Sequence, residues 1–361
     1  MIPSNVLLEV LRDPARLASL AEDDWDLLLR MARANRLIAR LEFLLGEQGA
    51  WESAPQRARD NIRGALAHVQ YLQLQIRREL MDVRKVLRGV EAPLVLLKGA
   101  AYLEAGLPCS QGRSLSDLDL LVRREDLPLV EKTLNEAGWE SDTEEDYDQR
   151  YYREWMHEIP PLKHRFRGVE VDIHHNLLAL TGRYRVPAEK LWEQARPLEE
   201  KGLRVLAPAD MLLHSAAHLL VSDELRGGLR DLFDIHQLYN HFCRTEADFP
   251  QALLARSHEL NLSRPLFYAL DTARELLHTP LAPMLRDRRN FDLPNRTGQK
   301  LMAHLIREVL RPRLPGESPP AFRQWLLYVR SHWIRMPPGL LLSHLTRKSL
   351  RRFGKTSAKS A

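Results

Sequence analysis

The sequence is poor in cysteine, and this excludes two classes of protein. Cys109 and Cys243 are its two cysteines in 361 residues, too few for a disulfide framework or a cysteine-based zinc site. We therefore expect two buried free thiols. No apolar run approaches the roughly 20 residues of a membrane-spanning helix, and charge interrupts the N-terminal segment MIPSNVLLEVLRDPARLASL before a signal-like core forms. These absences favour a cytoplasmic protein.

Acidic residues are missing from one part of the chain, the stretch from Ala321 to the end. It holds nine Arg and Lys residues and no Asp or Glu, whereas the net charge of the whole chain is +5. The basic tail 321–359 also contains Trp325 and Trp333, so it could bind nucleic acid through phosphate contacts and stacking. It could equally lie on an anionic membrane surface. A helical cap with a solubilising end is the third interpretation.

Changes in the spacing of apolar residues and in composition divide the chain into four expected regions. Apolar residues at steps of three and four between Ile62 and Leu87 predict a helix of about seven turns, within an N-terminal helical region, 1–90. Alternating strand-like and helix-like segments follow in 91–205 and predict an α/β core. Residues 206–310 again have helical spacing, and 311–361 form a Pro-rich linker and the basic tail. The expected fold class is α+β, a small mixed β-sheet core flanked by N-terminal and C-terminal helical regions.

Within the core, short apolar runs and glycines define the expected order of elements. Residues 139–160 are acidic and aromatic and are expected to form a loop. The expected elements are a strand at 93–97 that turns into a helix at Lys98-Gly99, a strand at 118–122, a helix at 124–138, and a hairpin of strands at 164–167 and 169–174.

Paired carboxylates are the main candidates for catalytic residues. Asp117 and Asp119 are separated by one residue on a strand, so both project to the same face, where like charges repel unless a cation lies between them. Asp172 lies alone on the strand VEVDIHH, where an isolated buried charge is unfavourable. Oxygen ligands of this kind suit Mg²⁺ or Mn²⁺. The pattern indicates a two-metal site that holds a triphosphate; solvated acids at strand ends are the alternative.

Basic residues and a glycine accompany these acids. Lys98 and Gly99 open a helix, where free backbone N–H groups attract phosphate and the glycine permits close approach. Arg113 can add a guanidinium for a triphosphate oxygen. His174 is a candidate contact on the acceptor side, and a structural role is its alternative. His214 and His218 are interpreted as helix-packing residues, and Asp231 and Asp234 as members of helix-surface ion pairs.

These motifs carry a resemblance to a known family. The segments LLKGAAYLEAGLPCSQGRSLSDLDLLV, VEVDIHHNL, LAPADMLLHSAAHLL and LRDLFDIHQL resemble the nucleotidyltransferase superfamily of DNA polymerase β-like proteins, and within it the uncharacterised bacterial family 5, over residues 90–240. The resemblance implies that Asp117 and Asp119 are metal ligands, that Asp172 is a third ligand or the base, and that Lys98 meets phosphate. The superfamily commonly has a Gly-Ser turn where this chain has Lys98-Gly99.

The expected function follows from the acids and from the resemblance together. It is an Mg²⁺- or Mn²⁺-dependent transfer of a nucleoside monophosphate from a nucleoside triphosphate to an unidentified acceptor, a small molecule or RNA, with release of pyrophosphate. The Lys-Gly turn motivates an alternative, a non-catalytic nucleotide-binding module that senses or scaffolds. Transfer of the terminal phosphate is a weaker third possibility.

Overall fold

A mixed sheet of seven short strands lies at the centre of the molecule. The computed structural model describes residues 5–141, 151–198, 203–221, 225, 227–318, 320–337 and 339. The strand order is β3-β4-β5-β2-β1-β7-β6. The strands are β1 (Val95–Leu96), β2 (Asp117–Leu121), β3 (Trp139–Glu140), β4 (Leu162–His164), β5 (Glu170–His174), β6 (Arg196–Leu198) and β7 (Leu203–Val205). Helices surround this sheet, so the α+β fold class is confirmed.

The middle of the sheet mixes parallel and antiparallel pairs. β2 pairs in parallel with β5 and antiparallel with β1, while β1 pairs in parallel with β7. β4 and β5 form the expected antiparallel hairpin, although β4 covers Leu162–His164 and thus begins and ends before the predicted strand at 164–167. The central strands are almost wholly apolar apart from their acids, which is typical of strands covered on both faces.

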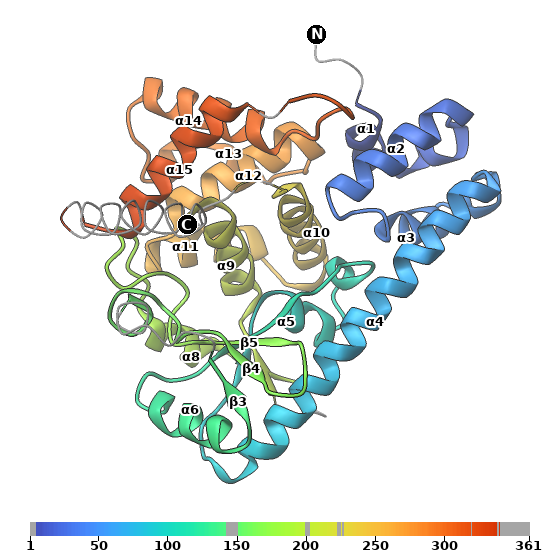
Figure 1. The fold of residues 1–361 in the computed structure, drawn as a ribbon. Coiled ribbons are helices and arrows are strands. Elements are labelled where there is room, and N and C mark those ends of the chain that lie inside the picture. The colour runs from blue at the N-terminus through green and yellow to red at the C-terminus, as the bar shows by residue number, and fades with distance from the viewer. Residues whose placement is uncertain are drawn as a thin grey trace, which may run out of the picture.

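Helices from the N-terminal and C-terminal parts of the chain flank the sheet. The 31-residue α4 runs diagonally past the sheet and contacts β2, whereas α9 to α12 gather in the C-terminal part (Figure 1). The α-helices are α1 (Val6–Arg12), α2 (Glu22–Ala34), α3 (Arg40–Glu47), α4 (Gln56–Val86), α5 (Lys98–Glu104), α6 (Leu127–Glu136), α8 (Ala188–Gln194), α9 (Pro208–Val221), α10 (Leu229–Thr245), α11 (Phe249–Glu259), α12 (Ser263–Leu277), α13 (Pro283–Arg286), α14 (Arg296–Leu310) and α15 (Ala321–Arg335). Short 3-10 helices lie at Pro14–Ser19, Trp51–Ser53, Leu87–Gly89, Pro108–Ser110 and Arg288–Asn290, and a short π-helical segment lies at Tyr151–Trp155.

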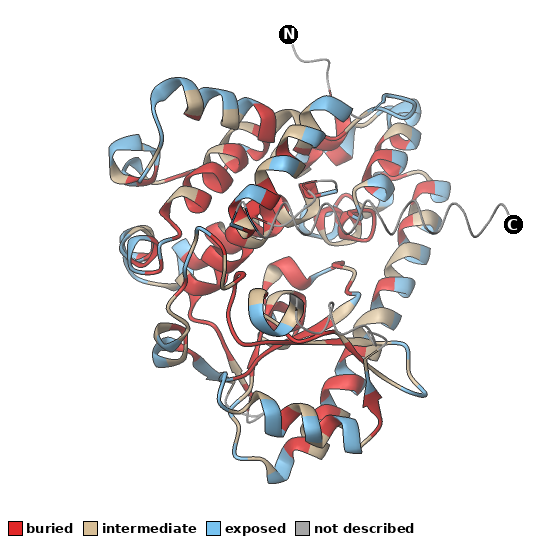
Figure 2. Ribbon diagram, turned by 60° about the vertical axis from the view of Figure 1, so that its left-hand side comes forward, coloured by how far each residue is buried: buried red, intermediate tan, exposed pale blue. Residues whose placement is uncertain are grey.

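α9 is the best buried of these helices and explains how the C-terminal part joins the sheet. Twelve of its residues are buried, and it packs against α5, α10, α11, α12 and α15. A helix that is apolar on most of its surface is stable where neighbours cover all sides. Figure 2 shows the buried positions on the inner sides of the helices and the exposed positions on their outer turns.

Three expectations from the sequence are corrected by the structure or concern residues outside its described part. Cys109 is buried as expected, but Cys243 is exposed because it lies on the outer side of α10. The expected loop 139–160 contains β3 and the π-helical segment Tyr151–Trp155, and its residues 142–150 lie outside the described part of the chain. Of the basic tail, 321–335 forms α15, which packs against α14 and α9; residues 340–361 are not described. None of the helices in the described residues is both long and apolar enough to cross a bilayer.

Candidate active site

The carboxylates meet because β2 and β5 are neighbours in register. Asp119 lies directly beside Asp172 in the parallel pair, and Asp117 lies beside Glu170. Paired residues on adjacent strands project to the same face, as do residues two apart on one strand. The three acids that the sequence singled out therefore share one face of the sheet, together with His174.

Asp119 is the most deeply buried of these acids and accepts hydrogen bonds from two side chains. Lys98 Nζ donates to its Oδ1 over 2.7 Å, and His174 Nε2 lies 2.9 Å from the same oxygen. The Asp119 side chain is 3% exposed. Burial favours the neutral acid, but Lys98 and His174 outweigh it and hold the pKa of Asp119 far below its ordinary value. Asp119 is therefore a permanent anion in the interior.

Asp172 has the opposite character. Its Oδ1 is buried without a hydrogen-bond partner. Burial, together with the neighbouring charge of Asp119, raises the pKa of Asp172 to about 8. One ligand atom from each of Asp119, Asp172 and His174 lies within 4.8 Å of the others. An orphaned carboxylate oxygen beside a permanent anion is a donor set that a divalent cation would complete.

Asp117 lies on the same face but outside the set of ligand atoms that come within 4.8 Å of one another. It is less buried than Asp119, and Ser116 Oγ donates to its Oδ1 over 3.1 Å. Burial and the negative charge of Asp119 raise the pKa of Asp117. Asp117 is close enough to interact with the charges of both Asp119 and Lys98.

The turn that carries Lys98 has an unusual backbone. Lys98 has φ 45°, a left-handed conformation that costs a residue with a side chain about 1–3 kcal/mol. At Gly99 a Cβ would overlap the side chains of Leu115 and Arg113, so any larger residue there would force these two side chains to move. The strained turn directs the Lys98 ammonium at Asp119, and β1 and α5 hold it in place.

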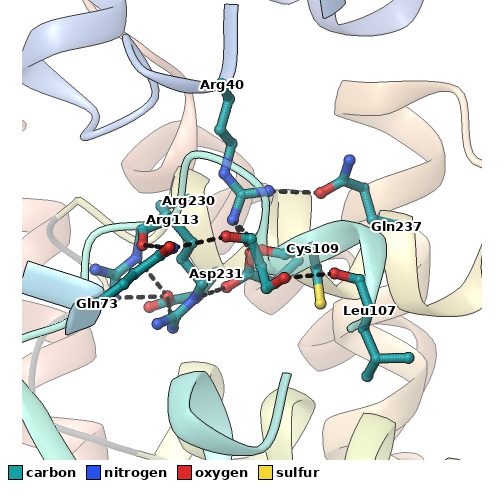
Figure 3. Close-up of polar contacts among 10 residues, drawn as sticks. Arg40, Gln73, Leu107, Cys109, Arg113, Arg230, Asp231 and Gln237 are labelled. Carbon is teal, nitrogen blue, oxygen red and sulfur yellow. Dashed lines mark hydrogen bonds and ion pairs between the residues drawn. The ribbon is translucent and has the colours of Figure 1, made fainter. Parts of the chain in front are cut away.

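Arg113 lies behind this turn, in a buried polar network (Figure 3). Its Nε donates to Asp234 over 2.8 Å, and its Nη2 lies 3.6 Å from Asp231. Arg40 on α3 also donates to Asp234, and to the carbonyl oxygen of Cys109 over 2.9 Å. The interpretation of Asp234 as a surface residue is therefore wrong: it is 1% exposed and joins α3, α10 and the loop before β2.

Histidines close the C-terminal side of the site. His214 and His218 are packed edge to face on α9, as expected for helix-packing residues. Burial is the main cause that lowers the pKa of both histidines, to about 3 for His218. His157 and Glu158 also lie here, because Glu158 forms an isolated β-bridge with His174. The sequence analysis missed both, since they fall in an aperiodic acidic segment.

Comparison with known protein families gives the class of this protein, a nucleotidyltransferase family. A family of uncharacterised nucleotidyltransferases matches residues 21–278 of the chain, and the chain belongs to that family. No curated protein matches it. Among solved structures, the crystal structure of JHP933 from Helicobacter pylori is 15% identical, with a TM-score of 0.33, and the match covers 77% of this chain and 97% of that one.

Proposed function

We propose that the protein transfers a nucleoside monophosphate from a nucleoside triphosphate to an acceptor hydroxyl, with a divalent metal ion held at the β2–β5 face. The observation that carries this is the register of β2 and β5, which places Asp119 beside Asp172 with one carboxylate oxygen unpartnered. Membership of the nucleotidyltransferase family supports the reaction class.

The metal would be held by Asp119 and Asp172, with Asp117 on the same face of the sheet. Carboxylate oxygens suit Mg²⁺ or Mn²⁺. When bound, such an ion would neutralise charge on the triphosphate and on the leaving pyrophosphate. His174 holds Asp119 through its Nε2 and thereby fixes the direction of the carboxylate.

The chemical step exchanges one P–O bond for another. The acceptor oxygen bonds to the α-phosphorus, the bond from that phosphorus to the bridging oxygen breaks, and pyrophosphate leaves with the electron pair. Where Asp119 and Asp117 hold the ion, Asp172 lies on the same face of the sheet and can take the hydroxyl proton as the general base. If Asp172 serves as a metal ligand instead, the proton passes to solvent.

The phosphates would enter on the side of the Lys98-Gly99 turn. Lys98 is charged, since its contact with Asp119 raises its pKa despite the opposing effect of burial. A lysine with three donors can hold Asp119 and a phosphate oxygen together. Arg113 contributes indirectly, because its side chain and that of Leu115 pack closely against Gly99.

The decisive experiment labels the acceptor. The full chain, Mg²⁺ or Mn²⁺ and each α-labelled nucleoside triphosphate are incubated with fractionated cell extract. We expect label in one fraction, small-molecule or RNA, and its loss in both Asp119→Asn and Asp172→Asn. Glu170→Gln, which replaces a half-buried carboxylate on the same strand that pairs with Lys163, serves as the matched control. Full labelling by Asp119→Asn would refute the assignment.

One observation favours a second function. Lys98 Nζ lies 2.7 Å from Asp119 Oδ1 and already balances the negative charge that a metal ion would otherwise balance. A lysine that permanently replaces the metal gives a module that binds a nucleotide for sensing or scaffolding. Stoichiometric nucleotide binding without pyrophosphate release, in the presence of every extract fraction and either metal, would select this function over transfer.

A further inference from the structure

A second group of candidate ligands lies next to the carboxylates and differs from them chemically. His157, Glu158 and His174 each offer one ligand atom, and the three atoms lie within 4.8 Å of one another. The His157 and His174 rings are 5.2 Å apart. Two imidazoles and one carboxylate are the ligands of Zn²⁺ and related transition metals, whereas Mg²⁺ prefers oxygen alone.

The backbone fixes these three residues relative to one another. Glu158 pairs with His174 in an antiparallel β-bridge. The amide of His175 donates to the carbonyl oxygen of His157 over 2.8 Å, and that of Ile159 donates to Ile173 over 3.0 Å. The ligands are therefore attached to the end of β5 by main-chain hydrogen bonds, which gives a geometry set in advance of binding.

One ring nitrogen of His174 has no hydrogen-bond partner. Its Nε2 donates to Asp119 Oδ1 over 2.9 Å, so Nδ1 is the nitrogen that remains to bind a metal ion. That Nδ1 is buried, has no hydrogen bond, and lies 3.4 Å from Glu158 Oε2. An imidazole nitrogen and a carboxylate oxygen this close together can bind the same metal ion.

The partners of His174 complete a recognised ligand arrangement. In metal sites, a ligating histidine commonly donates its other ring N–H to a carboxylate, which fixes the ring and makes it a better ligand. Asp119 is such a carboxylate. His157 also has a buried Nδ1 without a hydrogen bond, and its side chain is 18% exposed. Two orphaned imidazole nitrogens therefore occur in one cluster.

We propose that His157, Glu158 and His174 bind a transition-metal ion of the Zn²⁺ type, at a position separate from the Asp119–Asp172 carboxylates. Three protein ligands leave a coordination position for water or a substrate oxygen. The binding does not depend on nucleotide transfer, so it can be measured on the protein whether or not transfer occurs.

The test uses Co²⁺ as a spectroscopic probe on the full chain, after removal of metals with a chelator and without nucleotide. We expect one Co²⁺ per chain, visible absorption typical of mixed nitrogen and oxygen ligands, displacement by Zn²⁺, and no displacement by millimolar Mg²⁺. His157→Gln and Glu158→Gln should each weaken binding by about tenfold or more. His68→Gln, which removes an exposed histidine on α4, should leave it unchanged.

Several results would overturn the proposal. They are no Co²⁺ binding, binding unchanged in both ligand variants, or displacement by Mg²⁺. Loss of binding in Asp172→Asn with retention in His157→Gln would place the ion at the carboxylates instead. If the variants fail to fold, X-ray absorption of the Zn²⁺-loaded wild type decides: two imidazole ligands support the site, and a shell of oxygens alone refutes it.

Discussion

Replacing Lys98 with Met tests what this lysine does at the site. The substitution removes the ammonium that donates to Asp119 over 2.7 Å and keeps a side chain of similar length. Asp119 then retains His174 as its donor. Removing one partner from a buried ion pair costs about 3–5 kcal/mol, so the metal-free variant should unfold at lower urea concentration than the wild type.

The same substitution should strengthen metal binding, although it lowers the stability of the metal-free protein. A cation bound at Asp119 has the Lys98 ammonium as a close neighbour. At about 4 Å and an effective dielectric constant of about 20, two unit charges repel by about 4 kcal/mol. Movement of the flexible lysine relieves part of this repulsion, but even about 1.4 kcal/mol corresponds to tenfold tighter binding. We therefore expect Lys98→Met to bind Mn²⁺ at least about tenfold more tightly.

Two measurements check this prediction. Titration with Mn²⁺ followed by electron paramagnetic resonance gives the affinity, and urea unfolding with and without Mn²⁺ gives the stability. Mn²⁺ should restore most of the lost stability, because a ligand that binds the native state stabilises it. Lys98→Arg keeps the charge and is the control. Weaker Mn²⁺ binding by Lys98→Met than by the wild type would refute the electrostatic reasoning.

Three further predictions concern packing, the polar network and pH. Gly99→Ala should destabilise the protein by about 1–3 kcal/mol in urea unfolding, because its Cβ overlaps neighbouring side chains; unchanged stability would contradict this close approach. Asp234→Asn should cost about 3–5 kcal/mol, since it leaves buried guanidinium groups without their carboxylate, and the half-buried Asp231→Asn should cost clearly less. Burial lowers the pKa of His236 to about 4, so between about pH 6.5 and 4 the unfolded chain binds the extra proton and stability falls as pH falls. His236→Gln should therefore reduce the loss of stability between pH 7 and 5 by roughly 1–2 kcal/mol; an equal loss in both proteins would refute this.

The carboxylates of the site could be predicted because local pattern and sheet geometry agree. Asp117 and Asp119 alternate along one strand, and Asp172 interrupts an apolar strand, so both strands required a common partner for their charges. Parallel pairing of β2 with β5 then brings Asp119 beside Asp172. The order of the strands in the sheet, which places the hairpin strand β5 next to β2, could not be predicted from the sequence pattern.

The polar partners could not be predicted, since they lie far apart in the sequence. Asp234 has Arg230 one helical turn earlier, and that spacing is typical of a surface pair. Its actual partner Arg40 is 194 residues away. Likewise, Glu158 joins the site through a β-bridge to His174, and a bridge of one residue pair leaves no periodic signal. The metal role of the three aspartates and the four-region division of the chain stay predictions.

The network around Asp234 gives the strained turn its support. Lys98 can remain in a left-handed conformation when the surrounding structure compensates its cost, and Gly99 meets the Arg113 guanidinium directly behind it. That guanidinium is held by Asp234 on α10, which is held in turn by Arg40 on α3. For Arg113 to reach a triphosphate, it would have to leave two carboxylates. We therefore expect Arg113 to act on a bound phosphate only through Gly99 and Lys98, with both helical regions supporting the turn that carries the Lys98 ammonium.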